Sequence, residues 1–146
     1  MKSKYFLVLS LFILFGNSVN ITAQTEIQQP EKKYTIDNCV NEFNSAKTEP
    51  TKVGFQYWFA DKNFADGKTV KLSVVAPHLA THRPHKHAED EFFFVLEGTA
   101  EFYLDGKTKT VGAMTSLYCP SDVEHGIRNV GDSELKYLVI KKYLNK

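Results

Sequence analysis

Residues 82–98 read HRPHKHAEDEFFFVLEG, and they hold the strongest signal in the chain. Two histidines stand one residue apart, at His85 and His87, and a carboxylate follows at Glu91. An apolar run over residues 92–96 then leads into Gly98. Because side chains two residues apart on an extended segment point the same way, both histidines can face one centre. The pattern is typical of half of a metal site that leads into a β-strand.

The other half of such a site comes later in the chain. His125 begins a predicted strand, and it is the candidate fourth donor beside His85, His87 and Glu91. Three imidazoles and one carboxylate suit divalent iron, manganese, nickel, copper or zinc, and they leave coordination positions open for a substrate or dioxygen. A His-x-His pair alone is more often part of a solvated loop. The whole combination is what favours a metal site.

The segments around this stretch alternate apolar and polar residues with the period of a β-strand. Strands are predicted at residues 53–59, 70–76, 92–96, 100–104, 107–111, 114–119, 125–130 and 134–143. Asp-Gly pairs at residues 66–67 and 105–106 predict tight turns, and the strands are expected to form a meander. Apolar residues at helical spacing predict one short helix over residues 36–43. This content favours an all-β sandwich or barrel.

The amino terminus has a pattern of its own. Lys2 and Lys4 precede an apolar run over residues 5–15, and this predicts a secretory signal peptide at residues 1–23. The run is shorter than the ~20 residues that span a bilayer, so a retained membrane anchor is the weaker interpretation. Residues 24–33 are polar and predict a flexible lead-in, followed by one domain over residues 34–146. The mature protein is expected to be periplasmic or secreted.

Charge and cysteine content limit the partners. The chain has 18 basic and 17 acidic residues, and removal of Lys2 and Lys4 leaves 16 basic residues against the same 17. Without a basic excess, neither nucleic acid nor an anionic membrane is an expected partner. Cys39 and Cys119 allow one disulfide in an exported protein, although nothing in the sequence brings the two together.

The histidine pattern resembles the two motifs of the cupin superfamily. The first motif, His-x-His-x3-Glu-x6-Gly, falls on residues 85–98, and the second, Pro-x4-His-x3-Asn, falls on residues 120–129. The resemblance implies a jelly-roll β-barrel. It also implies that a metal inside the barrel is held by His85, His87, Glu91 and His125.

The sequence departs from the cupin pattern at three places. Leu79 and Met114 stand where the motifs usually begin with glycine, and Ser121-Asp122 replaces the end of a Pro-x-Gly turn. These glycines serve turns, and aspartate is among the residues that tolerate a left-handed backbone. The departures leave all four ligand positions in place.

Strand alternation predicts an exposed apolar face. If Glu91 faces the barrel interior, Phe92, Phe94 and Leu96 face outward. Three large apolar side chains in contact with water would form an unusual patch, so a cover is expected. Another sheet layer, the predicted helix or a second subunit could supply it. The resemblance to cupins favours a homodimer.

The leading functional hypothesis is an exported, metal-dependent enzyme that acts on a small organic molecule, with dioxygenase chemistry as the first expectation. Ala100, Phe102 and Leu104, assigned to the inner face, would form an apolar pocket wall that suits an aromatic or otherwise apolar substrate. Two alternatives stay open. One is a module that binds a small ligand or a metal without turnover, and the other is a cupin isomerase or lyase that acts on a sugar acid.

Other polar residues receive no assigned role. Candidates for a general acid or base are Tyr57, Glu101, Tyr103 and Arg128, although each is more often a residue of the sheet surface. His78 and His82 lack matching partners and are interpreted as ordinary loop histidines. No catalytic residue is assigned beyond the metal ligands.

Overall fold

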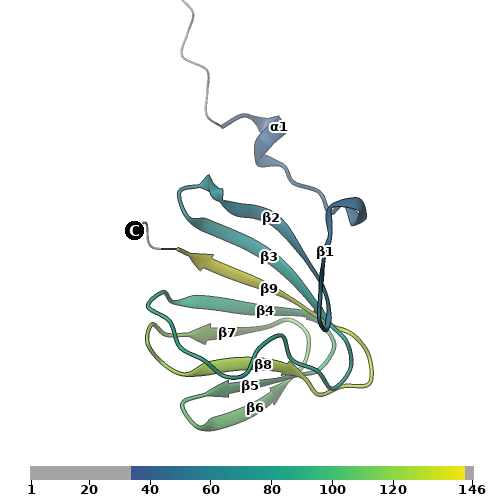
Figure 1. Ribbon diagram of the computed structural model, residues 1–146, viewed down its shortest axis with the longest axis vertical. Coiled ribbons are helices and arrows are strands. Elements are labelled where there is room, and N and C mark those ends of the chain that lie inside the picture. The colour runs from purple at the N-terminus through teal and green to yellow at the C-terminus, as the bar shows by residue number, and fades with distance from the viewer. Residues whose placement is uncertain (1–33, 144–146) are drawn as a thin grey trace, which may run out of the picture. The chain divides into compact units, whose positions relative to one another are not determined.

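A computed structural model describes residues 34–143, which are almost entirely β-structure (Figure 1). The all-β prediction is confirmed. The predicted signal peptide and lead-in lie outside the described residues. The elements, in chain order, are α1 (Ile36–Cys39), η1 (Ser45–Lys47), β1 (Glu49–Thr51), β2 (Gly54–Ala65), β3 (Lys68–Val75), β4 (Glu91–Glu97), β5 (Ala100–Leu104), β6 (Lys107–Val111), β7 (Thr115–Cys119), β8 (His125–Asn129) and β9 (Leu135–Lys142). In this part of the chain no helix is long and apolar enough to cross a bilayer.

The strands form two antiparallel sheets, one of six strands in the order β1-β2-β3-β9-β4-β7 and one of three in the order β6-β5-β8. The last strand, β9, lies between β3 and β4, so the predicted meander is wrong (Figure 1). Local alternation identifies strands but carries no information on which strands pair. This crossover arrangement agrees with the jelly-roll fold that the resemblance implied.

Two tight turns set the register of the hairpins. Asp66 and Gly67 connect β2 to β3 with φ values of 53° and 80°, and Asp105 and Gly106 connect β5 to β6 with 46° and 79°. Positive φ at both central residues is the requirement of a type I′ turn, whose twist matches that of the strands. Both predicted turns are confirmed.

The faces of β4 alternate as the sequence predicts. Glu91, Phe93 and Val95 are buried between the sheets, whereas Phe92 and Leu96 are 42% and 36% exposed on the outside. The inner residues belong to a core that extends across both sheets and includes Ala100, Leu117, Ile127, Leu135 and Tyr137. The metal-ligand candidate Glu91 therefore begins a strand whose inner face is fixed by core packing.

The predicted short helix is present, but it is shorter than expected. α1 is a single turn. A capping box between Thr35 and Asn38 caps its N-terminus, and the chain is extended again at Val40. None of its residues is buried. Further on, the Phe43 ring packs 5.1 Å from the Tyr57 ring on β2, a contact that favours an extended path over a longer helix. The helix therefore leaves the outer face of β4 exposed.

The two cysteines are both free thiols. Cys39 is exposed in α1, whereas Cys119 at the end of β7 is fully buried. The single disulfide that the sequence allowed is not formed.

Asn129, the last residue of the second motif, has a structural role. Its buried amide donates hydrogen bonds to the carbonyl oxygens of Val75 (2.9 Å) and Ser133 (2.7 Å), and its side-chain oxygen accepts one from the Gly131 N–H (2.9 Å). Unpaired buried backbone groups are costly, so this side chain stabilises the loop between β8 and β9.

Candidate metal centre

The four predicted ligands lie on two segments that the backbone joins. His85 and His87 are on the loop before β4, Glu91 is the first residue of β4, and His125 is the first residue of β8. The backbones of His85 and His125 exchange two hydrogen bonds of 3.0 and 2.9 Å. Next to them Pro84 lies against Gly126, where an added Cβ would be 3.3 Å from the Pro84 Cα. The loop is thereby held against β8.

All three histidines present the same ring nitrogen to the centre. Each Nδ1 faces a backbone carbonyl oxygen two residues away: His85 to Arg83 (3.2 Å), His87 to Glu89 (2.6 Å) and His125 to Val123 (2.8 Å). A carbonyl oxygen only accepts, so Nδ1 carries a proton in each ring, and Nε2 is the nitrogen left for a metal to bind. Such bonds fix the tautomer and orientation of metal-binding histidines.

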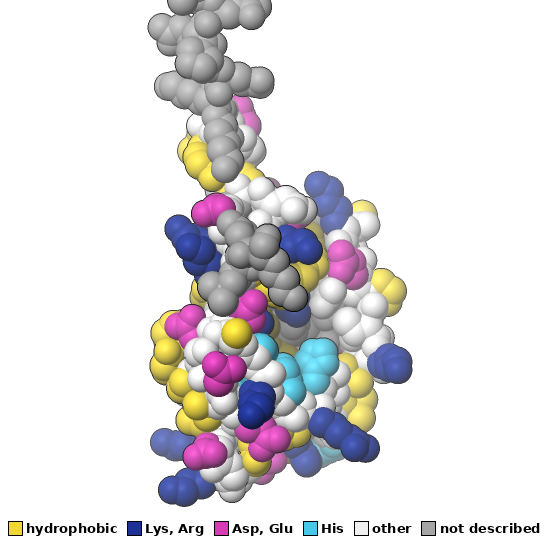
Figure 2. Space-filling model, turned by 60° about the vertical axis from the view of Figure 1, so that its left-hand side comes forward, with side chains coloured by type: hydrophobic (Ala, Val, Ile, Leu, Met, Phe, Trp, Pro, Cys, Tyr) yellow, Lys and Arg dark blue, Asp and Glu magenta, His cyan; other side chains and the backbone are white. Residues whose placement is uncertain are grey.

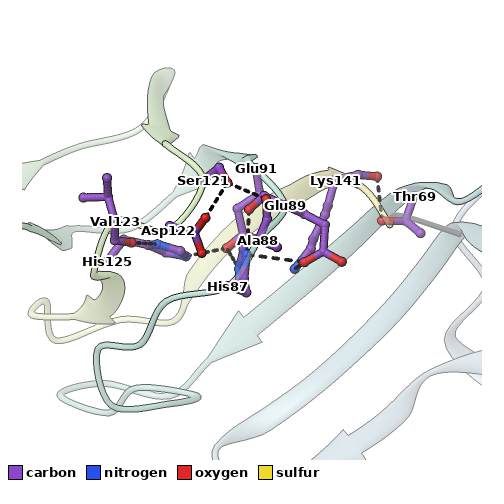
Figure 3. Close-up of polar contacts among 10 residues, drawn as sticks. All are labelled: Thr69, His87, Ala88, Glu89, Glu91, Ser121, Asp122, Val123, His125 and Lys141. Atoms are coloured by element: carbon purple, nitrogen blue, oxygen red, sulfur yellow. Dashed lines mark hydrogen bonds and ion pairs between the residues drawn. The ribbon is translucent and has the colours of Figure 1, made fainter. Parts of the chain in front are cut away.

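The ligand atoms converge. Those of His85, His87 and His125 all lie within 4.8 Å of one another. The Glu91 Oε1 atom is 3.1 Å from the His125 Nε2 and 3.5 Å from the His87 Nε2 (Figure 3). Donors bound about 2.1 Å from one ion lie roughly 3.0 to 3.4 Å apart, so these spacings fit a metal. The cluster could bind a divalent transition metal, whose identity stays open.

Burial decreases across the cluster from one side to the other. His125 and Glu91 are 0% and 6% exposed, His87 is half-buried and His85 is exposed. On the His85 side a cavity of about 130 Å³ opens. Figure 2 shows histidine side chains gathered at a hollow on one face of the molecule. A small molecule can therefore reach the ligand atoms from this side.

The cavity wall is mixed, with polar groups beside Trp58, Ile127 and Val139, which corrects the predicted apolar wall. It is formed mainly by the inner faces of β3 and β9, with Thr69, Lys71, Ser73, Tyr137 and Lys141. Ala100 and Phe102 do face inward, but they pack in the core instead of lining the cavity. The Phe93 ring, 6.4 Å from that of Phe102, lines the cavity in their place. Leu104, half-buried, is not in the lining either.

Known proteins show the same architecture. A sequence model of the family described as Cupin domain matches residues 71–141. The dimethylsulfoniopropionate lyase DddW of Ruegeria pomeroyi is 43% identical over 115 residues, which cover 75% of this chain and 75% of that protein. The chain belongs to the cupin superfamily.

Two further matches are less similar to this chain. The H2HPP isomerase of Bacillus subtilis is 35% identical over 74 residues, 50% of this chain and 31% of that protein. The crystal structure of a Cupin 2 conserved barrel domain protein from Salinispora arenicola superposes with a TM-score of 0.59 at 19% identity, and covers 71% of this chain and 87% of the other. At that identity the likeness concerns the fold alone. The named relatives include a lyase and an isomerase.

Several residues in the cavity of this cupin were not predicted to lie there. Three of them lie on strands that the sequence identifies: Lys71, Tyr137 and Lys141. The residues before and after each of them in the chain point to the other face of the sheet. The available signal was the run of polar residues at alternate positions of β3. His82 lies on an exposed loop, as predicted, and it also lines the cavity. His78 is exposed and pairs with Asp132 at 3.1 Å, outside the site.

The four polar candidates for acid or base lie elsewhere. Tyr57 donates its hydroxyl hydrogen to the Glu42 carbonyl oxygen (2.8 Å). Glu101 pairs with Arg128 at 3.7 Å, and Tyr103 donates to Glu124 at 2.6 Å. None of the four lines the cavity beside the ligands.

A buried thiol adjoins the site. Cys119 lies opposite Glu91 in the β4–β7 ladder, and its sulfur is within 4.8 Å of ligand atoms of Glu91 and His125. Burial raises the pKa of the Cys119 thiol to about 12, with Glu91 adding to the effect. The thiol is therefore neutral at ordinary pH, and a neutral thiol is a weak ligand.

Proposed function

We propose that this cupin is a metal-dependent enzyme that acts on a small polar molecule by lyase or isomerase chemistry. The observation that carries the proposal is the wall opposite the ligands, which holds hydroxyl and ammonium groups where a dioxygenase for apolar substrates needs an apolar surface. A divalent metal bound to His85, His87, Glu91 and His125 would polarise a substrate oxygen as a Lewis acid.

Tyr137 is the protein group best placed to move a proton in this cavity. Its side chain is 2% exposed on the inner face of β9, and its hydroxyl is 3.4 Å from the Thr81 hydroxyl. Burial raises the pKa of the Tyr137 phenol, and hydrogen bonds with Thr81 and Ser73 partly oppose this. The phenol is neutral at ordinary pH and can donate a proton to a substrate bound against it.

The test combines metal reconstitution with a substrate panel. Purified protein, loaded in turn with iron, manganese, nickel, copper or zinc, is followed by NMR with small hydroxy, keto and sugar acids and with dimethylsulfoniopropionate, the substrate in its relative's name. We expect metal-dependent elimination or isomerisation of at least one compound without oxygen uptake. The Tyr137→Phe variant should lose about 10²-fold or more in kcat.

Tyr103→Phe, on the outer face of the small sheet, is the matched control and should keep full activity. Oxygen uptake with catechols or flavonoids would contradict this proposal and would favour dioxygenase chemistry instead. Turnover of no compound with any metal would favour a binding module.

We also propose that the protein is a homodimer through the outer face of β4, β7 and β9. Phe92 lies opposite Tyr118 on one side and Ile140 on the other, and these three side chains are 42%, 47% and 42% exposed. Phe94, half-buried, and Leu96 continue the same outer face of β4, and soluble monomers rarely expose large apolar surfaces. A second copy of the same surface would cover it.

Gel filtration with light scattering checks the dimer. We expect the mass of two chains at micromolar concentration, and the mass of one chain for Phe92→Lys, which places a charge in the centre of the surface. Thr110→Lys is the control, because Thr110 is exposed on β6 in the other sheet. A wild-type protein with the mass of one chain would contradict the proposal.

A further inference from the structure

A band of polar side chains crosses the inner face of the six-stranded sheet beside the metal ligands. On β3 the alternate residues Thr69, Lys71 and Ser73 face inward, and their partners on β9 are Lys141, Val139 and Tyr137. Lys141 in turn lies opposite Glu91 on β4. Residues on these matched positions share one face of a sheet. The band therefore leads from the ligand Glu91 to Lys71.

The charges along this cavity are unbalanced. Three of the lining side chains are basic, Lys71, Arg83 and Lys141, and one is acidic, Glu91. Lys141 is partly neutralised, since its ammonium is 3.5 Å from a Glu89 carboxylate oxygen (Figure 3). A divalent metal at the site would add two positive charges, of which Glu91 offsets one. The loaded cavity would carry an excess of positive charge, which attracts an anion.

Lys71 is the cation in this band without an acidic partner. Among residues 34–143 no carboxylate forms an ion pair with it, and its ammonium instead lies 5.1 Å from the centroid of the Trp58 ring. Burial lowers the pKa of the Lys71 ammonium, with Glu91 opposing the effect. A partly buried cation without a counter-ion is destabilising, and such groups are typical of binding sites.

Resting on the proposed function, we propose that Lys71, held between Trp58 and the polar band, binds the carboxylate group of the substrate while the rest of that molecule reaches the metal ligands. A cavity of about 130 Å³ is well below the roughly 300 Å³ at which pockets for drug-sized ligands begin. The substrate is therefore a small organic carboxylate. Lys71 is a point charge on a flexible stem, which suits a single carboxylate.

The test measures binding of propionate, with propionamide as its uncharged counterpart and inorganic phosphate as a competing anion. NMR titrations are made with the metal-free and the zinc-loaded protein. We expect propionate to bind the wild type at least tenfold more tightly than propionamide or phosphate. Lys71→Met, which keeps the length of the side chain, should weaken propionate binding tenfold or more and leave the zinc content unchanged.

Two further variants keep the test decisive. Lys71→Arg retains the charge and should keep propionate affinity within a few fold. Lys68→Met, at an exposed position on the same strand, is the matched control and should behave as the wild type. Lysine-dependent propionate binding without turnover of the substrate panel would support this inference while removing the proposed enzyme. Equal propionate affinity in folded Lys71→Met, or equal affinity of the wild type for propionamide or phosphate, would overturn it.

Discussion

Replacement of His125 by alanine is expected to remove stoichiometric metal from the protein. His125 is fully buried, its Nδ1 is held by the Val123 carbonyl oxygen, and its Nε2 is 3.1 Å from Glu91. Loss of a residue that merely orients a ligand lowers metal affinity about 10- to 100-fold, so loss of the ligand itself should exceed about 100-fold. Elemental analysis after dialysis against metal-free buffer measures the change.

The control separates ligand loss from general damage. His87→Ala, at a half-buried position, should lose metal as His125→Ala does, whereas His78→Ala, outside the site, should retain it. Metal that binds only the folded state raises stability by about 2.7 kcal/mol at a hundredfold excess over Kd, and this rise should vanish in both ligand variants. Full metal content in His125→Ala would remove the proposed centre.

Replacement of Gly98 by alanine is expected to lower the free energy of unfolding by about 3 kcal/mol. Gly98 follows β4 with a φ of 90°, and a Cβ there would lie 2.6 Å from the Glu134 carbonyl oxygen and 3.0 Å from the Leu135 Cα. Both neighbours are backbone atoms at the start of β9, so they cannot rotate away. Urea unfolding of the metal-free protein measures the difference.

Gly106 supplies the matched comparison. It has a similar φ of 79°, but an added Cβ meets nothing within 4 Å. Gly106→Ala should therefore cost only the strain of a left-handed alanine, about 1 kcal/mol. Equal losses of stability in the two variants would show that backbone conformation, and not the contact with β9, explains the glycine of the first motif.

The sequence is sufficient to predict what depends on local pattern. Alternation in β4 predicts which of its side chains are buried, because core packing forces one face inward. The same alternation makes His85 and His87 point together, and the Asp-Gly pairs define two turns. These features need only neighbours a few residues away. The approach of His125 to the pair is not local. The sequence offered His125 as the fourth donor because it begins a later strand, and the resemblance to the second cupin motif implied the same residue.

What could not be predicted depends on how strands pair. The insertion of β9 between β3 and β4 places Lys71 and Tyr137, which are more than sixty positions apart in sequence, in one cavity beside the metal ligands. Ala100 and Phe102 face inward as predicted, but they pack with Phe93 in the core and do not line the cavity. A mixed wall therefore replaces the expected apolar one. The inference about substrate type changes with it.

X-ray absorption spectroscopy of the metal-loaded protein tests the proposed centre most directly. With His85, His87, His125 and Glu91 as ligands, the first shell should hold nitrogen and oxygen at about 2.0 to 2.2 Å with the multiple scattering of imidazole rings. Cys119 lies close enough to be a competing ligand and would give a sulfur shell at about 2.3 Å. A spectrum with that sulfur shell, or one without imidazole, would contradict the account.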